Sequence, residues 1–190
     1  MYWWDDFEVG DTGSIGQRYG ATVKRYDLMN KLLNGLENNP FGRRHIIDLW
    51  QEADLTSTGG LPPCAFLTDW SCRSVDGKMY LDIHLHQRSN DYVMAGFINK
   101  IQYVALQMMV ACHLGYEVGV FSHYVHNLHI YDRHIDAANE ILERKSLGIQ
   151  PFIELNVKPK TNFYDIKLSD FSVHGIKGIE KIKSELEIAI

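Results

Sequence analysis

Cysteine is scarce in this chain, with three residues in 190 and no C-x-x-C pair. An odd and small number provides no disulfide framework, and the spacing provides no cysteine-based zinc site. No apolar run is long enough to cross a bilayer, and the start, MYWWDDFEVG, has neither the basic nor the apolar region of a secretory signal. We therefore expect a cytoplasmic protein that does not contact membranes.

Positive charge is also in short supply, because 19 Lys and Arg face 24 Asp and Glu for a net charge of −5. A general nucleic-acid binder needs basic residues to neutralise phosphates, so no nucleic-acid partner is expected. Basic residues do gather at Arg43-Arg44 and around Arg88. Guanidinium groups concentrated on an acidic protein favour one small anion, such as a phosphate, and the Ser89 hydroxyl adds a donor.

The length and the hydrophobic content of 45% suit a single domain over residues 1–190. Helical spacing of apolar residues, strand-like segments and an Asp76-Gly77 turn alternate without a strict βαβ rhythm. We therefore predict a mixed α/β or α+β domain in which helices pack on one large sheet. The predicted helices are 25–37, 99–114 and 132–147, and the predicted strands are 43–50, the two arms of 64–89, 119–131 and 151–159.

Nine histidines are many for this length, and His123, His126 and His129 recur at every third residue. Imidazole is a common zinc ligand, but a spacing of three on a strand sends successive side chains to opposite faces. We therefore predict no metal. His129 and Tyr131 are two apart and share a strand face, which suits hydrogen bonding to a hydroxyl; a packed aromatic pair at the sheet margin is the alternative.

Cys64 has an unusual setting, because it follows two glycines, a leucine and two prolines in GGLPPC. A cysteine that only packs needs no such stiff corner, whereas a nucleophile must meet one atom of its substrate. An arginine close to the sulfur would favour the reactive thiolate. Cys72 and Cys112 lie in apolar segments and are predicted to be inert core thiols.

Several short motifs occur in order along the chain: WDDF at 4–7, NNPFGRR at 38–44, LPPC at 61–64, QRSND at 87–91, Asn99, HIY at 129–131 and IAI at 188–190. In these motifs, from Trp4 to Ile190, the chain resembles the thymidylate synthase family, which includes the pyrimidine nucleotide hydroxymethylases. The resemblance implies a single-domain, thymidylate synthase-like fold with a large mixed sheet, and a homodimer formed through that sheet. It also implies folate-dependent modification of C5 of dUMP, with 5,10-methylenetetrahydrofolate as co-substrate and no metal.

The resemblance assigns a role to each motif. Cys64 is implied to be the nucleophile that adds to C6 of the pyrimidine, which lets C5 attack a one-carbon unit. Asn99 favours uracil, because an amide can accept from N3–H and donate to O4, whereas cytosine reverses both groups. The remaining implied roles are the 5′-phosphate for Arg88 and Ser89, nucleotide binding for Gln87, the partner subunit's phosphate for Arg43 and Arg44, the sugar 3′-hydroxyl for His129 and Tyr131, pyrimidine and folate for Asp91, and folate packing for Trp4, Ala189 and Ile190.

The sequence departs from the family pattern at three places. It begins where a family N-terminal region, with an arginine for the phosphate and a proton-relaying glutamate, would end. Ala65 stands where histidine is usual, and Asp69 where glutamine is common. AGFIN at 95–99 replaces the more usual Gly-Leu-Pro-Phe-Asn. These departures indicate a divergent member.

Three functions follow from the resemblance. Methylation of dUMP to dTMP leads, because the ending EIAI resembles the closing segment of the synthases. Hydroxymethylation of dUMP or dCMP is the first alternative, since the same chemistry finished by water in place of hydride gives that product. A non-catalytic nucleotide-binding module, or half of a split enzyme, is the second.

Overall fold

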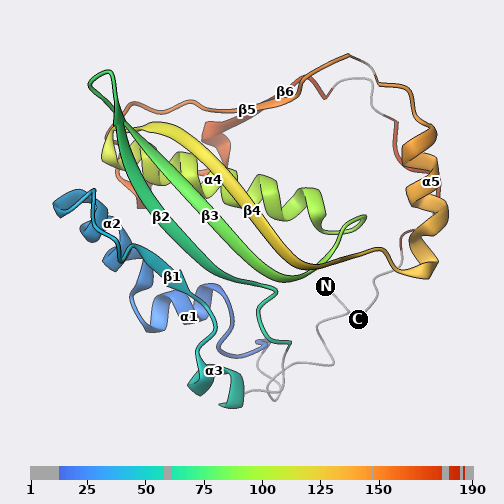
Figure 1. Cartoon of the computed structure of the whole chain (residues 1–190), viewed down its shortest axis with the longest axis horizontal. Coiled ribbons are helices and arrows are strands. Elements are labelled where there is room, and N and C mark those ends of the chain that lie inside the picture. Colours follow the sequence, from blue (N-terminus) through green and yellow to red (C-terminus); the bar gives the residue numbers. More distant parts are fainter. Residues whose placement is uncertain (1–12, 58–60, 147, 177–179, 185, 187–190) are drawn as a thin grey trace.

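The computed structural model describes residues 13–57, 61–146, 148–176, 180–184 and 186 (Figure 1). Its centre is a mixed sheet in the order β1-β2-β3-β4. The first two pairs are antiparallel, and β3 and β4 run parallel to each other. The four strands are Ile46–Asp48 (β1), Ala65–Val75 (β2), Lys78–Asp91 (β3) and Glu117–His129 (β4).

The predicted hairpin within 64–89 is confirmed, because β2 and β3 pair along most of their length. Asp76 and Gly77 both have positive φ angles, 51° and 79°. This backbone conformation matches the right-handed twist of the strands it joins, and aspartate followed by glycine adopts it at low cost.

One face of the sheet carries the hydrophobic core. Leu81, Ile83 and Leu85 alternate along β3 and are completely buried. They pack with apolar residues of α2 (Leu28–Asn38) and α4 (Gly96–Leu114), which lies behind the sheet in Figure 1. Both helices were predicted, and α4 begins three residues earlier than expected.

The opposite face of the sheet is covered by no helix within the described residues (Figure 1). The Asp69 carboxylate lies between two histidines there, 2.9 Å from His84 Nδ1 and 2.9 Å from His86 Nε2. The Tyr124 ring stacks on His86 at a centroid distance of 5.4 Å and is 55% exposed. The face is therefore a mixed aromatic and polar surface that is partly exposed.

The predicted strand at 151–159 does not join the large sheet. It forms β5 (Phe152–Leu155), which pairs with β6 (Phe171–His174) in a separate two-stranded sheet. The predicted helix 132–147 begins as a 3₁₀ turn at Asp132–His134 and continues as α5, Ile135–Glu143. Among the described residues, no helix has the length and apolar character needed to span a membrane. The remaining short elements are α1 (Gly20–Arg25), α3 (Glu52–Ser57) and 3₁₀ turns at Phe163–Asp165 and Leu168–Asp170.

Candidate active site

The predicted site residues meet at one edge of the sheet. The parallel strands β3 and β4 end there at Asp91 and His129, which are partners in the register. Because β2 runs antiparallel to β3, its beginning lies at this same edge, and Cys64 directly precedes it. The first turn of α4 also begins here and contains Asn99. Segments that are up to 65 residues apart in sequence thus contribute side chains to one place.

Arg88 binds the backbone of residues 62–64, the corner that carries Cys64. Its Nε donates to the Pro63 carbonyl at 3.1 Å, and its Nη2 donates to the Pro62 carbonyl at 2.9 Å. Nη2 also lies 3.6 Å from Cys64 Sγ. The arginine expected beside the thiol is therefore present.

Tyr19 is a second support that the sequence did not reveal. Its hydroxyl oxygen accepts a hydrogen bond from the backbone N–H of Cys64 at 3.0 Å. Burial raises the pKa of Tyr19, so the phenol stays neutral at neutral pH. The residues are 45 positions apart, and no local pattern signals a contact of that kind.

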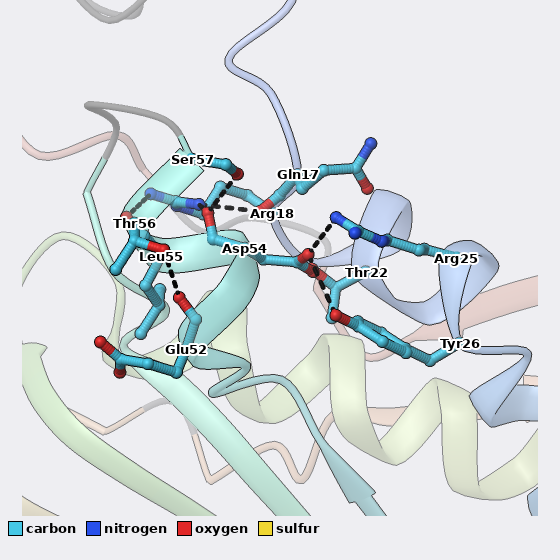
Figure 2. A network of polar contacts seen from close by, with 10 residues as sticks. All are labelled: Gln17, Arg18, Thr22, Arg25, Tyr26, Glu52, Asp54, Leu55, Thr56 and Ser57. Carbon is cyan, nitrogen blue, oxygen red and sulfur yellow. Dashed lines mark hydrogen bonds and ion pairs between the residues drawn. The ribbon is translucent and has the colours of Figure 1, made fainter.

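Arg18 links the same corner to α3, and Figure 2 shows it beside the residues of that helix. Its Nε donates to the Leu61 carbonyl at 3.2 Å, and its Nη1 donates to the Asp54 carbonyl at 2.6 Å. Only 4% of Arg18 is exposed. A buried guanidinium whose donors are used on backbone carbonyls fixes chain segments relative to one another.

The Asp54 side chain completes this network (Figure 2). Its carboxylate accepts hydrogen bonds from Thr22 Oγ1 at 2.8 Å, from Arg25 Nη1 at 2.7 Å and from the Tyr26 hydroxyl at 3.3 Å. Asp54 is 1% exposed. Helices α1 and α3 are thus tied together by one carboxylate, and through Arg18 to residues 61–64.

The side-chain amides of Gln87, Asn90 and Asn99 contact one another beside the Cys64 corner. Gln87 is 2% exposed, and its Nε2 donates to the Ser89 carbonyl at 2.9 Å and to Asn99 Oδ1 at 3.1 Å. Its Oε1 lies 2.8 Å from His123 Nε2. Asn90 Nδ2 adds a further donor to Asn99 Oδ1 at 3.3 Å. The predicted residues Gln87 and Asn99 are therefore in direct contact, and His123 and Asn90 were not anticipated.

Asp91 is the last residue of β3, and its side chain caps the turn that follows the strand. Its Oδ1 accepts from the backbone N–H groups of Val93 and Met94 at 3.2 and 3.3 Å. Its Oδ2 lies 3.3 Å from Nδ1 of His134, which is completely buried. The carboxylate is thereby held at the rim between β3 and the 3₁₀ turn after β4.

His129 and Tyr131 lie together, as their spacing predicted. Their rings meet edge to face at 4.9 Å and 89°. The strand ends at His129, two residues earlier than expected, so Tyr131 follows the strand rather than belonging to it. The histidine triplet is split between two faces, because His126 packs near Phe66 and His123 points to Gln87. The described residues contain no group of three or more His, Cys, Asp or Glu able to hold a metal.

The remaining predicted residues are two arginines and three residues outside the described part of the chain. Arg43 and Arg44 are exposed between α2 and β1, and within the described part of the chain no carboxylate pairs with either guanidinium. Trp4, Ala189 and Ile190 fall outside the described residues.

The other two cysteines were predicted to be core thiols, but neither is fully buried. Cys72 is half-buried against the core, and burial, with the nearby Asp82 charge, raises its pKa to about 11. A thiol with that pKa is almost entirely protonated at neutral pH and unreactive. Cys112 Sγ donates to the Lys158 carbonyl at 3.3 Å. Of the three cysteines, only Cys64 lies on a backbone corner that an arginine binds and has that arginine beside its sulfur.

Comparison with known proteins decides the family. Residues 1–188 match the family described as Thymidylate synthase. The chain belongs to the thymidylate synthase family. Thymidylate synthase from Streptococcus pneumoniae (strain ATCC 700669 / Spain 23F-1) is 53% identical over 173 residues, which cover 91% of this chain and 62% of that protein. Thymidylate synthase from Streptococcus sanguinis (strain SK36) is 52% identical over 173 residues, which again cover 91% of this chain and 62% of that protein.

A solved structure supports the same family. Thermostable thymidylate synthase A from Bacillus subtilis superposes with a TM-score of 0.84 at 32% identity, covering 100% of this chain and 68% of that chain. The predicted resemblance and the mixed-sheet fold of thymidylate synthases are confirmed. The chain spans 62% of the length of the streptococcal relatives.

The segment that leads to Ala189 and Ile190, which the family resemblance assigns to folate packing, is held by Glu140 of α5. Its carboxylate accepts hydrogen bonds from Arg144 and from the backbone N–H groups of Lys183 and Ser184. These donors lower the pKa of Glu140 to about 2. Because the pKa in the folded state lies below the ordinary 4.5, the contact stabilises the fold above pH 4.5 and is lost progressively as pH falls towards 2.

We expect Glu140→Ala to release this segment at neutral pH, where the wild-type carboxylate is charged. Trypsin should then cleave after Lys181 and Lys183 several-fold faster, as followed by mass spectrometry of the fragments. Glu143→Ala, near the end of the same helix, is the matched control and should leave the rate unchanged. Equal cleavage rates in the Glu140 variant and the wild type would show that the carboxylate does not hold the segment.

Proposed function

We propose that this chain methylates dUMP at C5 to give dTMP, with 5,10-methylenetetrahydrofolate as co-substrate. The observation that carries the proposal is the setting of Cys64, whose thiol stands on a corner fixed by Arg88 and Tyr19 at the edge where Asn99, Asp91 and His129 converge. Membership of the thymidylate synthase family makes the pyrimidine ring the expected target of that thiol.

The chemistry requires a nucleophile because C5 of uracil does not attack a one-carbon unit by itself. Addition of the Cys64 thiolate to C6 makes C5 an enolate carbon, which forms a bond to the methylene carbon. Loss of the C5 proton and departure of the folate nitrogen give an exocyclic methylene. Hydride from the tetrahydrofolate then completes the methyl group, dihydrofolate is formed, and Cys64 leaves.

The nucleotide is positioned by the residues around this edge. Arg88 and Ser89 bind the 5′-phosphate, with Gln87 supporting the nucleotide from β3 and Asn99 facing the base. His129 and Tyr131, whose rings are in contact, hydrogen-bond the sugar 3′-hydroxyl. The fixed backbone of the Cys64 corner supports this arrangement, since attack on C6 tolerates little slack.

The co-substrate binds next to the nucleotide. Asp91 contacts both pyrimidine and folate, and its placement at the rim of the site supports that role. Trp4 packs on the folate from one end of the chain, and Ala189 and Ile190 pack on it from the other. Their apolar cover excludes water, and this exclusion favours hydride transfer over hydroxymethylation.

We further propose that the chain acts in the cytoplasm as a single-domain homodimer formed through the uncovered sheet face. Tyr124 on that face is 55% exposed and Ile46 is 48% exposed, which suits burial against a second copy. Arg43 and Arg44 extend next to β1, at the border of this face, and bind the phosphate in the partner's site.

The proposal is tested by turnover. The purified 190-residue chain is incubated with dUMP and methylenetetrahydrofolate labelled at the methylene carbon, and the nucleotide products are resolved by mass. We expect a labelled product heavier by one methylene, with dihydrofolate formed in equal amount. A product that also carries the oxygen of a hydroxymethyl group would overturn methylation, and a complete lack of turnover would overturn the enzymatic function.

A further inference from the structure

The side-chain amides of Gln87, Asn99 and Asn90 form a hydrogen-bonded amide chain beside Cys64. In this amide chain, the contacts determine which atom of Gln87 and of Asn99 donates and which accepts. A backbone carbonyl can only accept, so the end of Gln87 that lies 2.9 Å from the Ser89 carbonyl must be its Nε2. The same Nε2 lies 3.1 Å from the Asn99 side chain, so the atom of Asn99 that it meets must be the oxygen. One carbonyl thus settles which end of each of the two amides is the oxygen and which the nitrogen.

Asn99 therefore presents its NH2 group to the site. Its Oδ1 accepts from Gln87 at 3.1 Å and, over a longer distance, from Asn90 at 3.3 Å. Among the residues that the structure describes, Asn99 Nδ2 has no hydrogen-bond partner. A group that can only donate pairs with the carbonyl at position 4 of uracil and opposes the amino group of cytosine.

His123 contacts the opposite end of the Gln87 amide from Asn99. Once Gln87 Nε2 faces Ser89 and Asn99, its Oε1 faces His123 Nε2 at 2.8 Å, and that nitrogen must carry the proton. Burial, with the nearby Lys100 charge, lowers the pKa of His123, so the neutral ring is the dominant form at neutral pH. His123 is then a neutral histidine protonated on Nε2, with Gln87 as its acceptor.

We propose that His123 is a positioning residue for base specificity, which acts through Gln87 to hold Asn99 with its NH2 group towards the pyrimidine. The inference rests on the proposed binding of dUMP and adds a residue that touches no substrate. Without the His123 N–H, the buried Gln87 Oε1 has no donor, and the amide chain can rotate to find one.

The test compares the affinities of the full chain for dUMP and dCMP by titration calorimetry. His123→Phe keeps a flat ring and removes the N–H that donates to Gln87. A cavity of about 320 Å³ that borders His123 and Lys100 leaves room for the phenylalanine ring. We expect the preference for dUMP over dCMP to fall about tenfold. His123→Gln, which keeps an N–H donor, should restore most of the preference. His174→Phe on β6 is the matched control and should not change it.

A purely structural role for His123 would weaken both nucleotides equally and leave their ratio unchanged, which would overturn the inference while dUMP binding stands. A wild-type chain that binds neither nucleotide would overturn both the inference and the proposed function. Nitrogen NMR of wild-type His123 provides a measurement that needs no variant. Protonation on Nε2 supports the inference, and protonation on Nδ1 refutes it.

Discussion

Serine in place of Cys64 should lower dUMP turnover by about 10⁴-fold or more, because a neutral hydroxyl without an adjacent base is a poor nucleophile. The corner itself should survive, since Tyr19 and Arg88 bind backbone atoms of residues 62–64 rather than the sulfur alone. The affinity for dUMP should therefore change by no more than a few-fold. Steady-state kinetics and calorimetry on the same preparation measure the two quantities.

Cys112→Ser is the matched control for this substitution. Cys112 lies on α4, and its thiol makes one hydrogen bond to the Lys158 carbonyl, which a serine hydroxyl can also make. We expect turnover to stay within about twofold of wild type in this variant. If Cys64→Ser kept a tenth of the wild-type rate, the thiol would not be the nucleophile.

Alanine in place of Asp54 should produce the largest loss of stability, about 2–3 kcal/mol of unfolding free energy. The substitution removes the acceptor of the buried Thr22 hydroxyl and of the Arg25 and Tyr26 donors. The Arg25 side chain is 47% exposed and can turn to water, so its part in the loss is small. For a chain of this size the melting temperature should fall by about 4–10 °C.

Asp136→Ala on the exposed side of α5 is the control, and its melting temperature should shift by about a degree or less. Urea unfolding followed by circular dichroism gives the unfolding free energy of both variants, and a thermal scan with the same signal gives their melting temperatures. Because Arg18 joins Asp54 to Leu61, the Asp54 variant should also lose turnover at temperatures where it remains folded. An Asp54→Ala protein as stable as the Asp136→Ala protein would show that the network in Figure 2 contributes nothing to stability.

Local patterns were sufficient for the parts of the fold that local physics determines. The Asp76-Gly77 turn selects its hairpin because few residues accept two consecutive positive φ angles. The α2 helix follows from the leucines on one of its faces, and it ends before Pro40. Strand alternation also correctly predicted that His123 and His126 lie on opposite faces of the strand.

Contacts between distant segments could not be read in this way. The β5 strand was predicted, but its partner β6 lies in a mixed stretch whose pairing depends on tertiary structure. The hydrogen bond from Cys64 to Tyr19 and the link from Arg18 to Leu61 each span more than 40 residues. The sequence predicted a nucleophile at Cys64 with an arginine beside it, and the structure places Arg88 there, whereas the contacts that fix the backbone around Cys64 became visible only in three dimensions.

The covalent bond between Cys64 and the pyrimidine can be observed with 5-fluoro-dUMP and methylenetetrahydrofolate. Fluorine at C5 does not leave as a cation, so the reaction should stop after the one-carbon unit is attached, with the thioether to C6 still intact. Intact-mass and peptide mass spectrometry should then find nucleotide and folate together on the peptide that contains Cys64. A protein that gains no mass, or that carries the adduct at Cys72 or Cys112, would show that this thiol does not attack the ring.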